Sequence, residues 1–315
     1  MLISTKTSVY SITEIMGKPE LVLDNVDVRR IAETNNKYII VLADGSIIIK
    51  DGEKDKIMQT GITDRIDCIL ALEEDPLELL LGCTPPNLYK FTEGKGLAKP
   101  VAKFQSLAVR DEWFTPWGGP PAVRSMGMTN DGWIYADIHV GSIMRSSDKG
   151  ETWEPVKPGL HRDVHQVVTC PINNDRVYAN TYLSVYVSED RGDTWYHRSG
   201  ALSDRYGRGI AVNPMDPDVL LCGVSDGPIG ENVHGQLYWS GDAGVNWVHI
   251  VDGFPGSTRN NIDTFHIQFD GEHAWVSDEN RLYNSQDRGR TWSLYWSAPE
   301  EIIMFDTGDG CISRT

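Results

Sequence analysis

Three arginines stand at the start of short β-prone runs that recur along the chain. The runs begin at Arg29, Arg124 and Arg208 and continue as Arg-Ile-Ala-Glu, Ser-Met-Gly-Met and Gly-Ile-Ala-Val. If these runs are equivalent strands of a repeated fold, their first side chains meet at one end of it. An arginine guanidinium can donate two parallel hydrogen bonds to an oxyanion, so these three arginines predict binding of a carboxylate, sulfate or phosphate. The alternative is that each arginine pairs with an acid and joins neighbouring repeats.

Three histidines, His139, His165 and His234, fall in three successive repeats at positions expected to face the same site. Three imidazoles that leave a fourth position open can hold a divalent metal ion and activate water. No short spacing enforces this cluster. The competing interpretation is that these histidines bond backbone groups or water independently of one another.

Further side chains with useful chemistry are expected at the same end of the repeats. Asp67 and His165 begin β-prone runs, and Tyr182 and Glu231 lie in loops that should converge on them. Glycoside cleavage generally uses two carboxyl groups. The chain offers many acids, so Asp67 and Glu231 are catalytic candidates without a defined pair.

Two tryptophans and one more arginine complete the set of candidate ligand-binding residues. Trp113 and Trp117 lie in a long insertion over residues 110–121, and Arg205 lies in a loop between repeats. The tryptophans fit a platform on which a sugar stacks, and they equally fit a small core within the insertion itself.

A repeated sequence motif indicates the strands and turns that must position these side chains. The pattern S-x-D-x-G-x-x-W occurs four times, beginning at Ser146, Ser188, Ser240 and Ser285. Its chemistry suits a tight hairpin turn, because Asp bonds the backbone of its own turn and Gly adopts positive φ at no steric cost. The Trp that follows begins the next strand and can bury its ring against the neighbouring sheet.

Weaker copies of the strand before each motif extend the repeat to seven units. The strands begin roughly 38 to 55 residues apart, near the spacing of four-stranded propeller blades. A second set of short β-prone runs precedes them and predicts the innermost strand of each blade. The last of these runs, near residues 301–305, has no following strands of its own. The sequence therefore predicts an all-β, seven-bladed β-propeller over residues 1–315, closed by N- and C-terminal strands, with six blades as the alternative.

The motif resembles that of the Asp-box, or neuraminidase-repeat, propellers. These include sialidases, xyloglucan-cleaving glycosidases, sortilin-type receptors and the photosystem II assembly factor family. The resemblance implies that Asp148, Asp190, Asp242 and Asp287 lie in structural turns away from the functional face. The sequence departs from sialidases, because Val28-Arg-Arg-Ile-Ala32 lacks the expected proline. Xyloglucan-cleaving enzymes generally use two facing propellers, and one is predicted here.

Net charge, hydrophobicity and cysteine content limit the classes of partner and the cellular location that we expect. The formal net charge is −16, which repels phosphate backbones, so nucleic acid is not expected as a partner. We find no apolar run of membrane-spanning length and expect no membrane partner. The sequence has five cysteines and no C-x-x-C pair, which indicates reduced thiols and predicts a cytoplasmic location.

These observations leave three functions open. The first is a hydrolase-like propeller that acts on an anionic, sugar-like small molecule in an axial funnel. The second is a non-catalytic scaffold for a protein partner, as the assembly-factor relatives imply. The third is a metal-dependent hydrolase or lyase that uses the histidines.

Overall fold

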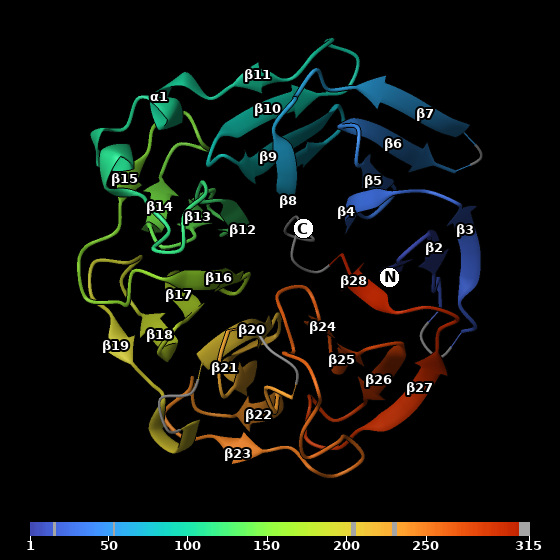
Figure 1. Cartoon of the computed structure of the whole chain (residues 1–315), viewed down its shortest axis with the longest axis vertical. Helices are drawn as coiled ribbons and strands as arrows, with labels where there is room; N and C mark the ends of the chain where they lie inside the picture. Colours follow the sequence, from blue (N-terminus) through green and yellow to red (C-terminus); the bar gives the residue numbers. More distant parts are fainter. Residues whose placement is uncertain (15–16, 53, 203–205, 229–231, 309–315) are drawn as a thin grey trace.

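The computed structural model describes residues 1–14, 17–52, 54–202, 206–228 and 232–308. Seven four-stranded antiparallel sheets surround a central axis, as Figure 1 shows down that axis. The predicted seven-bladed β-propeller is therefore confirmed, and the six-bladed alternative is wrong. Among the described residues, no helix has the length and apolar character needed to cross a membrane.

The innermost strand of each blade lies against the axis (Figure 1). In order round the ring, the inner strands are β28 (Ile302–Asp306), β4 (Val28–Glu33), β8 (Arg65–Glu74), β12 (Val123–Met128), β16 (Val164–Cys170), β20 (Tyr206–Asn213) and β24 (Ile267–Asp270).

Each inner strand pairs with a second strand, which pairs with a third. The second strands are β1 (Leu2–Thr5), β5 (Tyr38–Leu42), β9 (Leu77–Thr84), β13 (Ile134–Ile138), β17 (Asn173–Thr181), β21 (Asp216–Ser225) and β25 (His273–Asp278). The third strands are β2 (Ser8–Ser11), β6 (Ser46–Asp51), β10 (Leu88–Thr92), β14 (Ser142–Ser146), β18 (Ser184–Ser188), β22 (Gln236–Ser240) and β26 (Arg281–Ser285).

The outermost strands form the rim of the ring, and several of them are short. They are β3 (Glu20–Asp24), β7 (Lys54–Gln59), β11 (Lys99–Pro100), β15 (Glu154–Pro155), β19 (Tyr196–His197), β23 (Val248–His249) and β27 (Ser293–Ser297). Three short helices lie between blades: α1 (Ala102–Gln105), η1 (Ala108–Glu112) and η2 (Gly200–Leu202).

The blade that closes the ring combines both ends of the described chain. Strand β28 pairs antiparallel with β1, with Phe305 opposite Ile3 and Asp306 opposite Leu2. Strands β2 and β3 then complete the sheet. This is the closure predicted from the unpartnered run near residue 301.

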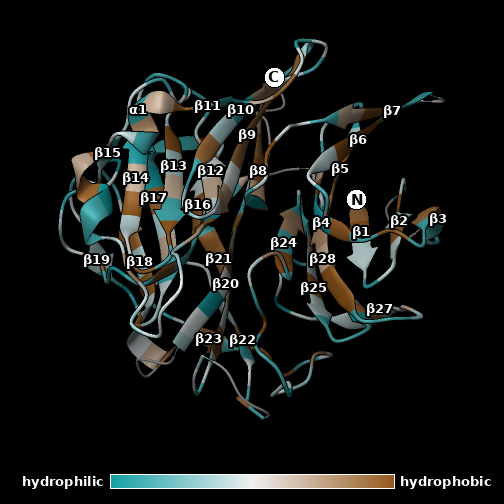
Figure 2. Cartoon of the chain, turned by 45° about the horizontal axis from the view of Figure 1, so that its top comes forward, coloured by the Kyte–Doolittle hydropathy of each residue, from teal (hydrophilic) through white to brown (hydrophobic). Residues whose placement is uncertain are grey.

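Apolar side chains pack between the facing sheets of neighbouring blades. Ile39, Ile47 and Ile49 of one blade, for example, join Leu79 and Leu81 of the next in a single buried cluster. Figure 2 shows the hydrophobic residues concentrated along the strands, with hydrophilic residues on the connecting loops. This follows from the alternation of side chains on strands whose two faces are both covered.

The S-x-D-x-G-x-x-W motifs form the turns after the third strands. In the first copy Ser146 Oγ accepts the N–H of Gly150 at 2.8 Å, and Asp148 Oδ1 accepts the N–H of Thr152 at 2.8 Å. Lys149 and Gly150 both have positive φ, at 55° and 87°, which is the geometry of a type I′ hairpin turn. The Trp153 ring is buried in the core between blades. These aspartates are structural, as expected.

Candidate functional site

The starts of the inner strands surround a cavity of about 490 Å³ at one end of the axis. We call it the mouth cavity. Four arginines contribute to its wall, and the other polar lining residues are Asp67, His139, Asp263, Thr264, His266 and Glu301. The arginines are Arg30, Arg65, Arg124 and Arg208. The expectation that inner-strand starts bring arginines together thus agrees with the geometry, although one member of the set differs.

Arg124 and Arg208 come from β12 and β20 and approach the same oxygen of Asp263. Their guanidinium nitrogens lie 3.9 and 3.6 Å from Asp263 Oδ1, beyond ordinary hydrogen-bond length. Burial favours the neutral acid, but the charges of Arg208 and Arg124 hold the pKa of Asp263 below its ordinary value. Each guanidinium has five N–H donors, so one shared carboxylate oxygen cannot satisfy them all.

Arg30 and Arg65 surround Asp67 on the other side of the mouth cavity. Arg65 Nε lies 2.8 Å from Asp67 Oδ1, and the Thr84 hydroxyl donates to Asp67 Oδ2. Arg30 donates to the backbone carbonyl of Asp67. The candidate catalytic Asp67 therefore lies in the cavity wall as an ion-paired carboxylate that orients the two arginines.

A second cluster lies at the edge of the mouth cavity, on the loop after β13 and at the start of β16. His139 Nε2 and His165 Nε2 lie 3.5 and 3.3 Å from Asp163 Oδ1. The candidate ligand atoms of these three residues all lie within 4.8 Å of one another. Two of the three predicted metal-binding histidines are therefore brought together, and the third donor of the cluster is Asp163.

His165 is fully buried and held on both ring nitrogens. Its Nδ1 lies 2.6 Å from the carbonyl oxygen of Gly207, which requires the proton on Nδ1. The Tyr206 hydroxyl lies 3.0 Å from Nε2 and donates to its lone pair. Burial lowers the pKa of His165, and burial together with Arg124 lowers the pKa of His139. Both imidazoles are therefore neutral near pH 7.

Several predicted residues lie outside both clusters. His234 is 60% exposed, pairs with Asp226 at 2.8 Å and lies apart from the cluster that His139 and His165 form with Asp163. Arg29 is exposed and does not line the mouth cavity. Tyr182 is exposed, stacks on His161 and does not line the cavity either. Arg205 and Glu231 lie outside the described residues.

The two tryptophans of the insertion have different surroundings. Trp113 is buried in the core with Phe104, so the interpretation as a core of the insertion applies to it. Trp117 is 63% exposed and its ring centroid lies 5.2 Å from that of His139. It therefore borders the histidine cluster and is placed to contact a ligand there.

Two features explain the residues that sequence reasoning missed. A β-bulge between Val28 and Arg30 turns Arg30, and not Arg29, toward the axis. Asp163 comes directly before β16, in a connection between blades, and the register of β16 is irregular between Val164 and Gln166, so strand alternation does not define its side-chain direction. Asp263 carried no local signal.

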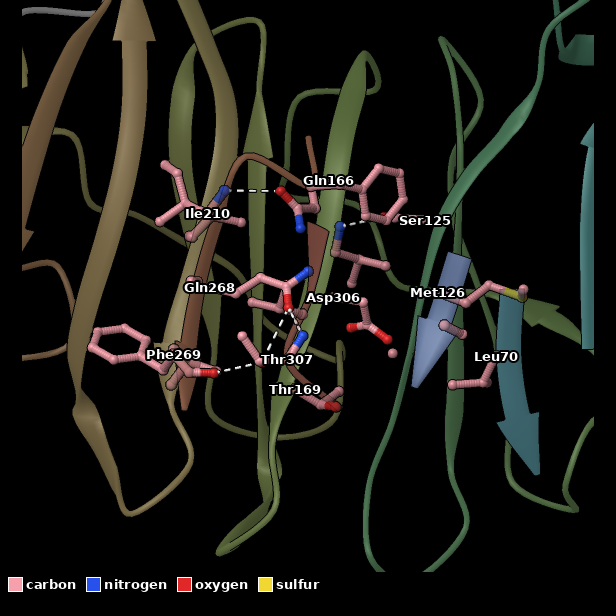
Figure 3. A pocket seen from close by; sticks show the side chains of 18 of the residues that line it. Leu70, Ser125, Met126, Gln166, Thr169, Ile210, Gln268, Phe269, Asp306 and Thr307 are labelled. Atoms are coloured by element: carbon pink, nitrogen blue, oxygen red, sulfur yellow. Dashed lines mark hydrogen bonds between the residues drawn. The ribbon is translucent and has the colours of Figure 1, made fainter. Parts of the chain in front are cut away.

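Deeper along the axis, a narrower cavity of about 150 Å³ lies between the inner strands (Figure 3). Its polar side chains are used to join neighbouring blades. Gln166 Oε1 accepts the N–H of Ile210 at 2.9 Å, and Gln268 Oε1 accepts the N–H of Thr307 at 2.9 Å (Figure 3). Because these polar groups are occupied by the ring itself, the mouth cavity is the stronger candidate for ligand binding.

Comparisons with known proteins fit this fold. The family model described as sortilin, neurotensin receptor 3, matches residues 141–234, which is less than half of the chain. The xyloglucanase Xgh74A of Acetivibrio thermocellus is 26% identical over 216 residues, covering 54% of this chain and 25% of the relative. This chain thus spans about a quarter of that relative's length.

Solved structures give the same picture. The GH74 xyloglucanase from Xanthomonas campestris superposes with a TM-score of 0.61 at 15% identity, covering 85% of this chain and 45% of that one. YCF48 bound to D1 peptide superposes with a TM-score of 0.57 at 15% identity, covering 93% and 84%. This propeller resembles those of xyloglucanases and YCF48. The predicted resemblance to xyloglucanase-type and photosystem II assembly factor-type propellers is confirmed.

Proposed function

We propose that this propeller binds a small anionic ligand in the mouth cavity and acts on it as a hydrolase. The observation that carries the proposal is the convergence of Arg124 and Arg208 on a single oxygen of Asp263. Arg208 Nη2 also donates to the Pro228 carbonyl oxygen at 3.1 Å, which holds this guanidinium in the cavity wall. A carboxylate or phosphate in the cavity would accept hydrogen bonds from the two guanidiniums.

The class of ligand we favour is an acidic carbohydrate. The xyloglucanase relatives support a carbohydrate, and the arginines add the requirement for negative charge. The three acids that line the mouth cavity, Asp67, Asp263 and Glu301, all lie in ion pairs with basic side chains. Because each acid is held by a basic partner, none is free to form the opposed carboxyl pair of a glycosidase, and this hydrolase would activate water by another group.

Binding is the first part of the proposal to test. Isothermal titration of the wild-type protein with uronic acids, their oligomers and sugar phosphates should reveal a ligand. Replacing Arg124 or Arg208 by Gln should weaken its binding at least about tenfold, as expected for loss of a charged hydrogen bond. Arg29→Gln is the matched control, because Arg29 is exposed and does not line the cavity. Equal weakening by all three substitutions would contradict the proposal.

Catalysis is tested separately. Release of reducing ends from acidic oligosaccharides and from neutral xyloglucan should be followed with wild type and Arg124→Gln. We expect turnover of an acidic substrate that is lost in the variant. Binding without any turnover would remove the hydrolase from the proposal and retain the binding site.

A second candidate function is docking of a peptide or protein segment through an acidic group. The observation that favours it is the likeness in fold to YCF48 bound to D1 peptide, which superposes over 93% of this chain with a TM-score of 0.57. A peptide carboxylate would meet the same arginines. Titration with acidic peptides distinguishes the two, because only the docking function predicts that peptides bind more tightly than the corresponding small acids.

A further inference from the structure

His139, Asp163 and His165 combine features that a cluster of polar side chains rarely has by accident. Their ligand atoms lie within 4.8 Å of one another, with His139 Nε2 and His165 Nε2 at 3.5 and 3.3 Å from Asp163 Oδ1. Donor atoms around a tetrahedral metal ion with bonds of about 2.0–2.1 Å are about 3.4 Å apart. We propose that these three side chains bind a divalent transition-metal ion at the edge of the mouth cavity.

The tautomer of His165 is what a metal ligand requires. The hydrogen bond from Nδ1 to the Gly207 carbonyl, at 2.6 Å, leaves the Nε2 lone pair directed away from that carbonyl. A ligating histidine almost always donates its other ring N–H to a carbonyl or carboxylate, which orients the ring and fixes the tautomer. Gly207 therefore supplies the supporting contact that the site needs.

The surroundings of Asp163 add to the case for a cation. His165 Nε2 lies 3.3 Å from Asp163 Oδ1. Asp163 Oδ1 is buried and, among the described residues, accepts no hydrogen bond of good geometry. A buried acceptor left without a donor destabilises the folded protein. A metal ion between the three donor atoms removes this cost.

Tyr206 offers the competing arrangement. Its hydroxyl, 3.0 Å from His165 Nε2, satisfies one of the three acceptors when no metal is bound. It leaves Asp163 Oδ1 without a donor, whereas a metal ion would satisfy all three. The Tyr206 hydroxyl thus acts as a placeholder: it occupies the position that a metal ion would take at His165 Nε2, and it would turn aside when the ion binds.

The chemistry of the donors defines the class of ion. Two imidazole nitrogens and one carboxylate oxygen suit Zn²⁺ and the divalent ions of iron, cobalt, nickel and manganese, and do not suit Ca²⁺ or Mg²⁺. Three protein ligands leave at least one position for water or for a ligand atom. Trp117, whose ring centroid lies 5.2 Å from that of His139, borders the site on its exposed side.

The surrounding charge predicts how the site is coupled to the mouth cavity. Arg124 and Arg208 lie close enough to act on both histidines through their charge, and Asp263 neutralises part of it. A dication beside two guanidiniums is favourable when an anion lies between them. If the proposed anionic ligand binds between the guanidiniums, the metal ion and the ligand should each tighten the binding of the other. A metal-bound water would then supply the nucleophile, which the ion-paired acids do not activate.

The test is a titration of chelator-treated, dialysed protein with Zn²⁺, in competition with a chromophoric chelator. Wild type should bind one equivalent, and Co²⁺ should give visible absorption bands of a nitrogen- and oxygen-ligated ion. Asp163→Asn, which keeps the side-chain shape, and His139→Ala should weaken Zn²⁺ binding at least about tenfold. His234→Ala is the control, since this exposed histidine also pairs with an aspartate but lies outside the cluster.

Thermal unfolding separates loss of the site from loss of the fold. Zn²⁺ should raise the melting temperature of wild type and of His234→Ala, and should not raise that of a folded Asp163→Asn variant. Failure of wild type to bind Zn²⁺ or Co²⁺, or equal binding by all variants, would overturn the metal site. Anion titration of the metal-free protein is a separate readout, so the arginine site and the metal site can fail independently.

Discussion

The carboxylate of Asp306 accepts a hydrogen bond from the backbone N–H of Glu33, with 2.6 Å between Oδ2 and N. Asp306 ends the inner strand of the closing blade and Glu33 ends the inner strand of the next. The bond therefore joins two blades at the point where the ring is closed. Asp306 is buried, and burial raises the pKa of its carboxyl group to about 6.

This pKa predicts a dependence of stability on pH. A carboxyl whose pKa is higher in the folded state than in the unfolded state binds its proton more tightly when folded. Its stabilising contribution is complete below about pH 4 and is lost as the pH rises through about 6. Compared with Asp306→Asn, wild type should lose about 2 kcal/mol of unfolding free energy between pH 4 and pH 7. Urea unfolding across this range measures the difference, with exposed Asp55→Asn as the control.

The turns of the repeated motif should contribute to stability and not to binding. Asp148→Ala removes the hydrogen bonds that Asp148 accepts from Ser146 Oγ and from the N–H and hydroxyl of Thr152. We expect a loss of about 1–2 kcal/mol by chemical denaturation, because the turn is exposed. Glu151→Ala, in the same turn but ion-paired only at the surface, should cost less than about 0.5 kcal/mol. A change in anion affinity in Asp148→Ala would contradict this assignment.

Gly207 should resist substitution because its neighbours leave no room for a side chain. A Cβ there would lie 1.8 Å from Oδ1 of Asn180 and 2.8 Å from the carbonyl oxygen of Thr181. Asn180 is fully buried and donates to the Gly209 carbonyl at 2.9 Å, so it cannot turn away freely. Gly207→Ala should lower the unfolding free energy by about 1–3 kcal/mol. Gly227→Ala, where nothing lies within 4 Å of the added carbon, should leave it unchanged.

Tyr206→Phe tests the placeholder role of the tyrosine hydroxyl. The phenol donates to His165 Nε2 at 3.0 Å and must leave that lone pair before a metal ion binds it. Removing a hydrogen bond worth about 1 kcal/mol from the metal-free state should tighten Zn²⁺ binding about fivefold. Weaker Zn²⁺ binding in Tyr206→Phe would instead identify the hydroxyl as a ligand. Chelator competition at constant pH measures the change.

Much of the ring could be predicted from sequence, because each copy of the repeat predicts the same blade structure. The third strands, the inner strands and the closure by β28 and β1 all follow from the spacing of the runs. The starts of the inner strands surround a cavity, as expected, because they converge in any closed ring. Arg124 and Arg208 belong to it for that reason.

The individual contacts could not be predicted, since they depend on irregularities within the repeat. The bulge beside Arg30 exchanged the roles of Arg29 and Arg30, as a slip of one residue moves a side chain to the other face. His234 lies in a loop whose path no periodicity defines, and it meets Asp226 instead of the other histidines. Asp263 lies in a connection between blades, where the repeat carries no information about side-chain direction.

The pairing of β28 with β1 also has a consequence for assembly. The inner strand of that blade is joined to the other three through space and not through an adjacent turn, so its release exposes one edge of β1 and one free strand. The free strand β28 can pair with the exposed edge of β1 in the same molecule or in a second copy. A population of molecules opened at this seam and then concentrated would close on one another, giving strand-exchanged dimers from an otherwise edge-protected ring.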